Sequence, residues 1–327
     1  MQVNDAILQK GAFLFGAEPP ALRSLGGSDG AVYEYQGDEI QSILKFVPTQ
    51  PERIQIAREK WEFVDYLARH GVSVCQPILS RNSQLLEVVQ DGEAAWLVSS
   101  TVKAAGEHVN WGNVGEYADA VFEEWGRVMG QMHALTQTYT GGQHIESWRE
   151  ECQSFSRWSS DDPAIHAKWD ALIPDLAALP ETPDGYGLIH NDLHPHNFLV
   201  NIGDGRLHIT VIDFECCVHH WFITDIAIAL FFVAVGWVRV SDKEMPHDAF
   251  VQRFWDRFVA GYRQENMLDP AWLKHLPTLL KHHQILLYIV FSHEWQEHNE
   301  WQARTLDDWR RKILGDVPVL DVEPWRK

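Results

Sequence analysis

The pattern of apolar and polar residues changes character along the chain. Up to about residue 103, short runs of alternating apolar and polar residues are separated by glycine-containing turns, which predicts β-strands joined by hairpins. A short helix should precede them and end at Pro19-Pro20. Between residues 51 and 71 the apolar residues recur at helical spacing and the run stops at a glycine, so we expect one amphipathic helix among the strands.

Helical spacing dominates after Gly106. Strong helices are expected over residues 117–136, 223–238, 249–265 and 279–298. A predicted hairpin interrupts them, with strand-like runs on both sides of a turn at 203–205. Strands followed by helices are typical of an α+β protein. We therefore predict two lobes: a small antiparallel-sheet lobe over residues 1–103, and a large helical lobe with the inserted hairpin over residues 104–327.

The predicted hairpin and the segment before it, "LIHNDLHPHNFLV", carry the polar residues that bear on chemistry. Asp192 precedes the hairpin, Asn197 stands at its start and Asp213 at its end, so pairing of the two strands would bring Asn197 and Asp213 near each other. Phosphoryl transfer from ATP requires magnesium and a carboxylate aimed at the attacking hydroxyl. Asn197 and Asp213 are therefore candidate magnesium ligands and Asp192 a candidate base, with His190 holding the loop by hydrogen bonds.

Zinc bound through imidazoles is the alternative for this segment. The candidate ligands are His190, His194, His196, His219 and His220. However, the segment has no cysteine or carboxylate at a recognisable ligand spacing. Further along, His293 and His298 are five residues apart, whereas the HExxH zinc motif needs about four to place both imidazoles on one helix face. The sequence therefore favours phosphoryl transfer over zinc chemistry.

A glycine-rich turn and a lysine in the N-terminal lobe fit phosphate binding. In "GGSDG" the backbone N–H groups at Gly27, Ser28 and Asp29 can turn toward phosphate oxygens. No GK[ST] follows, so the turn is not a P-loop. Lys45 lies on the next predicted strand and alternates with apolar neighbours. Each feature alone is common, so the order of glycine turn, strand lysine and polar loop carries the interpretation.

Several of these segments resemble one enzyme family. "HNDLHPHN" at 190–197 and "VIDFE" at 211–215 resemble the catalytic loop and metal-binding segment of the aminoglycoside phosphotransferase and choline kinase-like family, which shares the protein-kinase fold. The usual form there is HGDLHPGN followed by IDF. Segments 125–136 and 219–230 resemble two further motifs of that family. The resemblance extends over about residues 25–230, and lies closest to a bacterial phosphotransferase branch that includes homoserine-kinase-like members.

The resemblance assigns roles by position. Asp192 matches the catalytic base, and Asn197 and Asp213 match the magnesium ligands. Lys45 matches the lysine that contacts the α- and β-phosphates of ATP. Asp225 matches an aspartate that braces the catalytic loop, although an N-cap of the following helix would explain it equally well.

The resemblance also implies an adenine-binding hinge and an acid that pairs with the lysine. Segment 101–106, "TVKAAG", matches the hinge whose backbone would meet adenine, near Val102 and Ala104. Glu59 and Glu62 lie about one turn apart on the predicted helix, and either could pair with the lysine. We expect Glu59 to be the partner.

The sequence departs from the family pattern at three positions. Asn191 and His196 replace glycines in the catalytic loop. Asparagine tolerates the left-handed backbone conformation better than most residues, so Asn191 should be a mild change, whereas His196 adds a ring at the site entrance. Glu215 stands where protein kinases have the glycine of DFG, and it could face either the metal or solvent.

The expected activity is transfer of the γ-phosphoryl group of ATP, with Mg²⁺, to a hydroxyl of a small aminoglycoside-, choline- or homoserine-like molecule. A protein serine/threonine kinase of the same fold and a nucleotide-binding pseudoenzyme are the alternatives. Acidic and aromatic residues of the C-terminal region could bind a cationic acceptor, but exposed helix faces for the acids and core positions for the tryptophans are the favoured interpretation. These are Asp256, Glu265, Glu294, Glu297 and Glu300 with Trp255, Trp295 and Trp301.

Composition and charge narrow the possible partners and compartment. The net charge of −19 over 327 residues excludes a typical nucleic-acid binder. It is compatible with a cationic acceptor, although a solvated acidic surface explains it as well. The longest apolar run, residues 226–238, is shorter than the ~20 residues of a membrane span. With four cysteines, no CxxC pair and no signal-peptide pattern, a cytoplasmic protein is expected.

Overall fold

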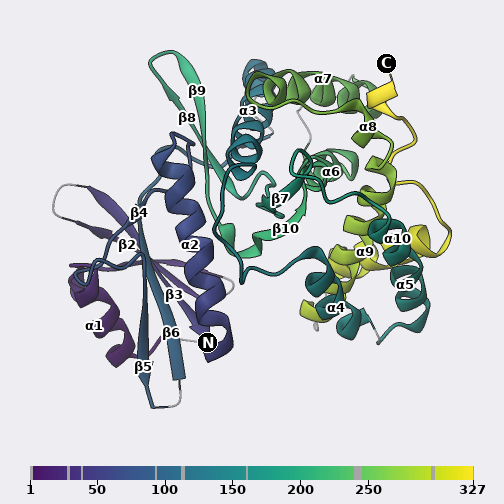
Figure 1. Ribbon diagram of the computed structural model, residues 1–327. Coiled ribbons are helices and arrows are strands. Elements are labelled where there is room, and N and C mark those ends of the chain that lie inside the picture. The colour runs from purple at the N-terminus through teal and green to yellow at the C-terminus, as the bar shows by residue number, and fades with distance from the viewer. Residues whose placement is uncertain are drawn as a thin grey trace. The chain divides into compact units, whose positions relative to one another are not determined.

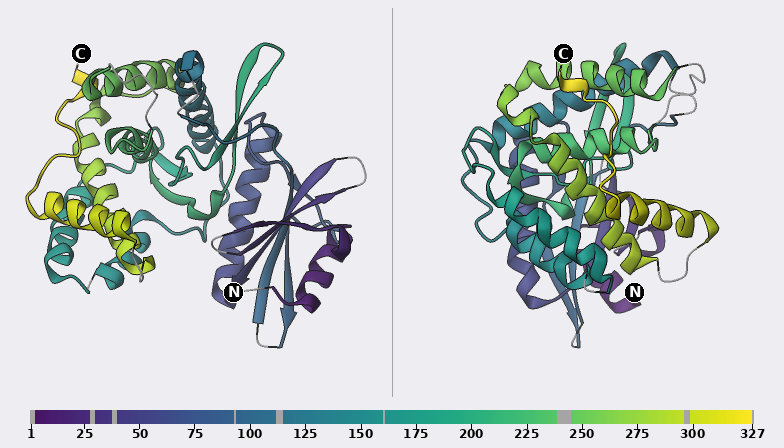
Figure 2. Two further views of the ribbon diagram at one scale, coloured as in Figure 1. Left: turned by 180° about the vertical axis from the view of Figure 1, so that it is seen from behind. Right: turned by 90° about the vertical axis from the view of Figure 1, so that its right-hand side faces the viewer.

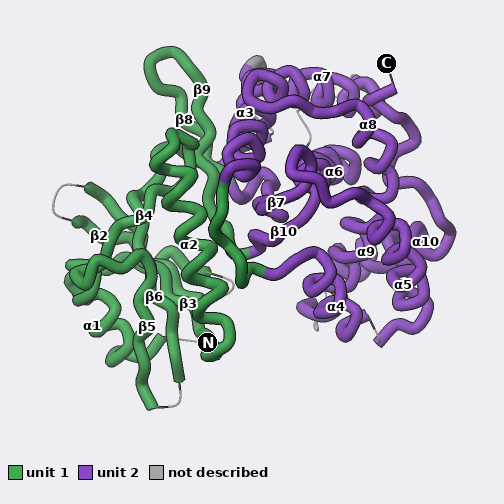
Figure 3. Tube along the Cα trace, in the orientation of Figure 1, with its two compact units in different colours: residues 1–107, 139–145, 198–215 green, residues 108–138, 146–197, 216–327 purple. Residues whose placement is uncertain are grey.

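The computed structural model describes residues 3–27, 30–37, 40–92, 94–111, 115–159, 161–238, 245–295 and 299–326. The chain divides into two compact units (Figure 3). Unit 1 comprises residues 1–107, 139–145 and 198–215, and unit 2 comprises residues 108–138, 146–197 and 216–327. Each unit is built from its own core and carries its own part of the predicted site.

Unit 1 contains an antiparallel sheet (Figure 1). Its strands follow the order β1-β2-β3-β6-β4, and β5 also pairs with β6. The bounds are β1 (Arg23–Gly26), β2 (Ala31–Gln36), β3 (Gln41–Thr49), β4 (Pro77–Ile78), β5 (Leu86–Asp91) and β6 (Ala94–Val102). Leu44 and Phe46 of β3 are fully buried, against Ile7 of the N-terminal helix α1 (Asp5–Leu14) among others. Lys45 between them occupies the opposite face, as the alternation predicts.

Helix α2 (Ile54–Arg69) is the amphipathic helix expected among the strands. It follows a short 3-10 helix (Pro51–Arg53) and buries Phe63, Val64 and Leu67. The chain leaves α2 through Gly71, whose φ of +83° lies in the left-handed region that a glycine adopts without steric cost. At the N-terminus, α1 ends at Leu14, and Pro19-Pro20 begin a separate 3-10 helix (Pro19–Ala21) rather than ending α1.

The predicted hairpin forms from β8 (Phe198–Gly203) and β9 (Arg206–Val211). Its turn residues Asp204 and Gly205 have φ of +51° and +74°, the backbone that a tight hairpin turn requires. The hairpin groups with unit 1 because Val200 bridges to Glu107 and Val211 to Val74. The hairpin is thus inserted among helices in the sequence but packs with the strand-rich unit. The lobe limits 1–103 and 104–327 remain predictions.

Unit 2 is mainly helical (Figures 1 and 2). A two-stranded sheet of β7 (Tyr186–Ile189) and β10 (Val218–Trp221) lies among the helices. The helices are α3 (Ala118–Thr136), α4 (Trp148–Ser159), α5 (Pro163–Ala177), α6 (Phe222–Ala234), α7 (His247–Glu265), α8 (Pro270–Leu273), α9 (Leu276–Glu294) and α10 (Glu300–Leu314). Short 3-10 helices occur at Gly115–Tyr117 and Pro324–Arg326, and another at Phe214–Cys216 joins the two units along the chain.

Helices α3 and α7 approach each other unusually closely. A Cβ at Gly126 would lie 1.9 Å from the carbonyl oxygen of Phe258, and one at Gly261 would lie 1.8 Å from that of Glu123, so both positions require glycine. Helix α6 explains the longest apolar run, since its residues from Phe222 to Val233 are all buried. Within the described ranges, no helix is long and apolar enough to cross a membrane.

Candidate active site

The catalytic loop of unit 2 is held by a buried aspartate. Asp225 in α6 accepts the backbone N–H of His190 at Oδ2 (3.0 Å) and that of Asn191 at Oδ1 (2.7 Å). The ring of His133, from α3, donates from Nε2 to Asp225 Oδ2 (3.2 Å). Asp225 is fully buried, and the N-cap of α6 is Trp221. Asp225 therefore braces the loop, and the N-cap alternative is wrong.

The loop brings Asp192 and Asn197 together. The Nδ2 of Asn197 donates to the carboxylate Oδ2 of Asp192 (2.7 Å) and to its backbone carbonyl (2.8 Å). The backbone N–H of Asp192 donates to His190 Nδ1 (3.3 Å), so the buried His190 ring supports the loop from within. Because the Asn197 amide nitrogen is engaged with Asp192, its amide oxygen is the atom suited to a cation. The Asp192 carboxylate is thus fixed in one orientation and partly open to solvent.

The substituted loop positions have structural partners. Asn191 has a φ of +63°, the left-handed backbone that the usual glycine would adopt, and its Nδ2 donates to Glu151 Oε1 of α4 (2.6 Å). The His196 ring lies 5.7 Å from that of His194 and 6.1 Å from that of His108. Burial, together with these two imidazoles, lowers the pKa of His196, which keeps its ring neutral at pH 7.

Lys45 and Asp213 meet within unit 1. Lys45 Nζ lies 3.4 Å from Asp213 Oδ1 and 2.5 Å from Glu215 Oε1. Burial acts to lower the pKa of Lys45, but the Glu215 and Asp213 carboxylates outweigh burial and the pKa is raised. For Glu215, burial raises the pKa although the Lys45 charge opposes it. Lys60 Nζ also donates to the Glu215 carbonyl (2.6 Å), which holds the segment after Asp213 in place.

The structure does not bring Glu59 to Lys45. Glu59 is buried in α2, where Oε1 accepts from Gln55 Nε2 (3.1 Å) and His144 Nδ1 (2.5 Å), and Oε2 accepts the His144 backbone N–H (2.7 Å). Glu59 therefore ties α2 to segment 139–145, and Glu62 lies on an exposed face. The expectation that Glu59 pairs with Lys45 is not met in this structure, because both carboxylate oxygens of Glu59 accept hydrogen bonds from Gln55 or His144.

The glycine turn and the hinge lie at opposite ends of the sheet strands. Gly27 has a φ of +136°, and a Cβ there would lie 2.6 Å from the carbonyl oxygen of Gly30, so the turn requires glycine. Ser28 and Asp29, the other predicted phosphate-binding positions, lie outside the described residues. At the hinge, the Val102 N–H donates to the carbonyl of Gln76 (2.9 Å). Ala104 follows two residues after β6 ends.

The side chains of the predicted site suit magnesium better than zinc. Among the residues that the structure describes, no three histidine, cysteine, aspartate or glutamate side chains converge on one metal position, so the zinc hypothesis has no support. Magnesium differs, because it is usually held by one or two protein oxygens plus substrate phosphates rather than by an all-protein cage. An amide oxygen such as that of Asn197 and a carboxylate such as that of Asp213 are the kinds of oxygen donor that magnesium accepts.

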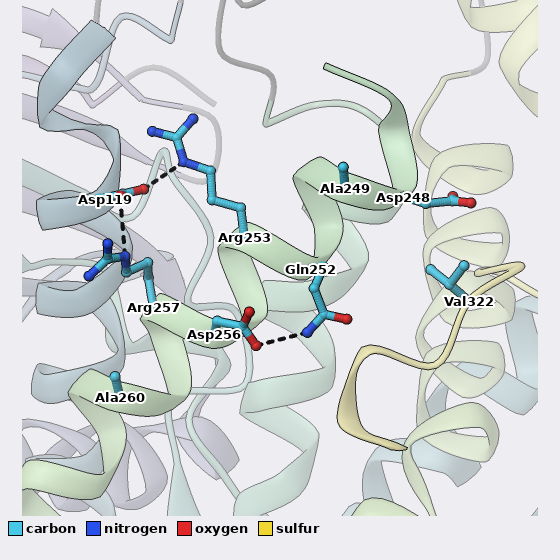
Figure 4. A pocket seen from close by; sticks show the side chains of 9 residues that line it. All are labelled: Asp119, Asp248, Ala249, Gln252, Arg253, Asp256, Arg257, Ala260 and Val322. Carbon is cyan, nitrogen blue, oxygen red and sulfur yellow. Dashed lines mark hydrogen bonds and ion pairs between the residues drawn. The ribbon is translucent and has the colours of Figure 1, made fainter. Parts of the chain in front are cut away.

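Most of the acids proposed for a cationic acceptor have other partners. Asp256 of α7 accepts from Gln252 Nε2 (2.8 Å) beside a hollow of about 740 Å³, where Arg253 and Arg257 both contact Asp119 (Figure 4). Two further acids of the predicted set have partners: Glu265 pairs with Arg127, and Glu300 pairs with Arg304. Trp255 is buried, and Glu297 lies outside the described residues. Trp301, by contrast, is 56% exposed.

Comparison with known proteins identifies the family. The family model described as "Phosphotransferase enzyme family" (APH) matches residues 22–276. Amicoumacin kinase of Bacillus subtilis (strain 168) is 32% identical over 328 residues, covering 97% of this chain and 94% of that protein. A solved structure of amicoumacin kinase hAmiN in complex with AMP-PNP, Ca²⁺ and Ami is 28% identical, with a TM-score of 0.85 and coverage of 97% and 95%.

More distant solved structures share the fold. A microcompartment-associated aminopropanol kinase is 24% identical with a TM-score of 0.74, covering 95% of each chain. These matches confirm the α+β class, the kinase-like fold and the resemblance found in the sequence. They also show an enzyme that uses ATP and a divalent metal to phosphorylate a hydroxyl of a small molecule. The chain belongs to the APH phosphotransferase family, as an ATP-dependent kinase with a protein-kinase-like fold.

Proposed function

We propose that the protein phosphorylates a hydroxyl group of amicoumacin or a closely similar antibiotic. The observation that carries the chemistry is the Asp192 carboxylate, oriented by Asn197 on a loop that Asp225 braces. The acceptor is inferred from the amicoumacin kinases, which match this chain over almost its whole length. A cationic acceptor is also favoured by the net charge of −19, which would attract it electrostatically.

In this proposal Asp192 accepts the proton of the attacking hydroxyl. The hydrogen bond from Asn197 Nδ2 to one carboxylate oxygen leaves the other to face the acceptor. A positioned general base contributes ~10²–10⁴-fold to the rate. His190 keeps the loop in shape through the Asp192 N–H and takes no proton itself.

The nucleotide is assigned to the remaining residues. Lys45 binds the α- and β-phosphates and is kept charged by Glu215 and Asp213. The turn of Gly27, Ser28 and Asp29 offers backbone N–H groups to phosphate oxygens, while Val102 and Ala104 meet adenine. Asn197 and Asp213 would hold Mg²⁺, which supplies positive charge to the β- and γ-phosphates.

We place the reaction in the cytoplasm. The four cysteines, Cys75, Cys152, Cys216 and Cys217, form no disulfide bond. Thiols are kept reduced in that compartment, where ATP is also present. No nucleic-acid or membrane partner is proposed, because the net charge is strongly negative.

The test is ADP release from Mg-ATP over a panel of acceptors. The panel contains amicoumacin, an aminoglycoside, choline, homoserine and 1-amino-2-propanol. Asp192→Asn serves as the blank, and Asp175→Asn, an exposed aspartate of α5, serves as the matched control. The proposal expects amicoumacin-dependent ADP release and a phosphorylated product with wild type and the control, and loss of ~10²–10⁴-fold in Asp192→Asn. Release with another acceptor but not with amicoumacin would refute the proposed substrate.

A further inference from the structure

Six aromatic side chains of unit 2 form a connected group, here called the aromatic row. Its members come from α6, α9, α10 and the residues just after α6 and α9. They are Phe232, Trp237, Phe291, Trp295, Trp301 and Trp309. Successive ring centroids are 5.3 Å apart from Phe232 to Trp237, 6.1 Å from Trp237 to Phe291, 4.3 Å from Phe291 to Trp295, and 5.7 Å from Trp295 to Trp301.

The aromatic row begins at the catalytic loop. The ring of His194 lies 4.6 Å from that of Phe232. On its other side, His194 Nε2 lies 3.5 Å from the Asp192 carboxylate and 3.5 Å from Asn197 Nδ2. A continuous series of contacts, all inside unit 2, therefore leads from the proposed base to the aromatic row. The buried ring of Phe232 thus connects the catalytic loop to Trp237, the first half-buried ring of the row.

The aromatic row is only partly buried. Phe232 and Trp309 belong to the core, whereas Trp237, Phe291 and Trp295 are half-buried and Trp301 is 56% exposed. Exposed single aromatic residues are common, but adjoining ones that make a continuous apolar surface usually mark a binding site. Since Phe232 connects this surface to the catalytic loop, the occupant that we assign to it is the acceptor of the reaction rather than a protein partner.

The ring angles indicate what kind of group would bind. Phe291 is 5° from parallel to Trp295 and 24° from parallel to Trp237, and Trp237 is 25° from parallel to Trp309. Trp301, the most exposed ring, is instead tilted by 40° to Trp237 and by 50° to Trp295. A site for an ammonium group needs the faces of several rings turned toward one point. Nearly parallel rings instead extend a stack, and a further flat ring adds to a stack in the offset arrangement that aromatic pairs prefer.

We propose that the aromatic row is the acceptor-specificity subsite and that it binds a planar aromatic ring of the acceptor, whose hydroxyl extends past His194 to Asp192. This proposal rests on the proposed function in one respect, namely that the acceptor is a small molecule. It goes further because it names the part of the molecule that is recognised and the residues that recognise it.

The test compares two amino alcohols, phenylalaninol and cyclohexylalaninol, which differ only in whether the ring is aromatic or saturated. Their dissociation constants are measured by ligand-observed NMR titration of the full chain with Mg²⁺ and AMP-PNP. The wild type should bind phenylalaninol about fivefold more tightly, the usual advantage of one aromatic stack. In Trp237→Leu and in Trp301→Leu this preference should fall to about onefold, while Trp237→Phe should retain it.

Trp158→Leu is the matched control. Trp158 is a partly exposed tryptophan of α4 whose ring contacts Phe155 and His293 rather than the aromatic row. It should keep the fivefold preference. Because Trp301 is mostly exposed, its replacement tests the proposal even if Trp237→Leu does not fold. For amicoumacin turnover, Trp301→Leu should raise KM about fivefold and leave kcat unchanged.

The outcomes separate this proposal from the proposed function. If the wild type binds both amino alcohols equally, or binds neither, the aromatic row is not a ring-binding subsite. If Trp301→Leu instead changes the molecular mass in light scattering, the row is an interface between copies of the chain and the proposal is overturned. A clear preference for the aromatic ring without amicoumacin turnover would support the subsite and refute amicoumacin as the substrate.

Discussion

Replacing Asp225 with asparagine should separate loop positioning from nucleotide binding. The Asp225 carboxylate, fully buried, accepts two backbone N–H groups and the His133 ring. Asparagine keeps one acceptor oxygen and turns an NH₂ group toward the other donor. Losing one hydrogen bond to a charged group costs ~1.5–3 kcal/mol, and leaving a buried donor unpaired costs ~1–3 kcal/mol. We therefore expect Asp225→Asn to lower the free energy of unfolding by ~3–5 kcal/mol.

The catalytic effect follows from the same contacts. The donors that Asp225 holds belong to His190 and Asn191, which directly precede Asp192. A shift of ~1 Å at a catalytic group costs ~10²-fold in rate. We expect kcat to fall by about that factor. The dissociation constant for Mg-AMP-PNP should change much less, because Lys45 and Asp213 are held independently within unit 1.

Three quantities are measured for each variant: kcat by ADP release, the dissociation constant for Mg-AMP-PNP by calorimetry, and Tm by thermal unfolding. Asp162→Asn is the matched control, because Asp162 also accepts two backbone N–H groups, those of Ala164 (3.2 Å) and Ile165 (3.4 Å), but at the start of α5. The control should lose Tm and keep kcat. If both variants lose kcat in proportion to their loss of Tm, Asp225 contributes only to stability and the bracing role is refuted.

Three further predictions concern Glu59, His282 and Cys75. Glu59→Gln should lower Tm by a few degrees, because it weakens the hydrogen bonds from α2 to His144 in segment 139–145. The KM for ATP should stay unchanged. A KM raised ~10-fold or more would indicate an ion pair between Glu59 and Lys45 that the structure does not contain. Burial lowers the pKa of His282 to about 4. Between pH ~4 and ~6.5 the unfolded chain therefore binds more protons at this residue than the folded chain does. The free energy of unfolding should rise with pH across this window. On acidification through the window, His282 should lower the free energy of unfolding by ~3 kcal/mol. Urea unfolding at several pH values checks this, and His282→Gln should flatten the slope. Burial raises the pKa of the half-buried Cys75 to about 12 and keeps its thiol protonated at pH 8, so iodoacetamide should modify the exposed Cys216 first. Peptide mass spectrometry would show this, and equal labelling would contradict the raised pKa of Cys75.

Local patterns in the sequence were sufficient for much of the fold and for the pairing of two residues in the predicted catalytic loop. Alternation placed Lys45 opposite the buried face of β3, and turn residues located the β8–β9 hairpin. The sequence placed Asp192 in the loop just before Asn197, and the structure joins the two side chains by a hydrogen bond. These features depend on neighbours a few residues apart, where backbone geometry alone determines which side chains share a face or a turn.

Helices α4, α5 and α10 were not predicted from the sequence. The apolar face of α4 and α10 is narrow, because each buries few residues: Trp148, Cys152 and Ser159 in α4, and Leu306, Trp309 and Ile313 in α10. His133 lies in segment 125–136, which resembles a family motif, but the sequence did not indicate its hydrogen bond to Asp225. Nothing in the sequence indicated that Glu151 would accept a hydrogen bond from Asn191.

The partners of the charged groups were decided by the tertiary structure. Glu59 and Glu62 are equivalent one turn apart on a helix, and only packing selects Glu59 for burial beside His144, which is distant in sequence. Glu215 could have faced solvent or metal, but the 3-10 turn after Asp213 brings it to Lys45. The sequence by itself determined which chemical groups are present and in what local order. Long-range packing decides which of these groups contact each other. An ion pair between residues distant in sequence produces no periodic pattern in either segment, so the sequence alone does not reveal it.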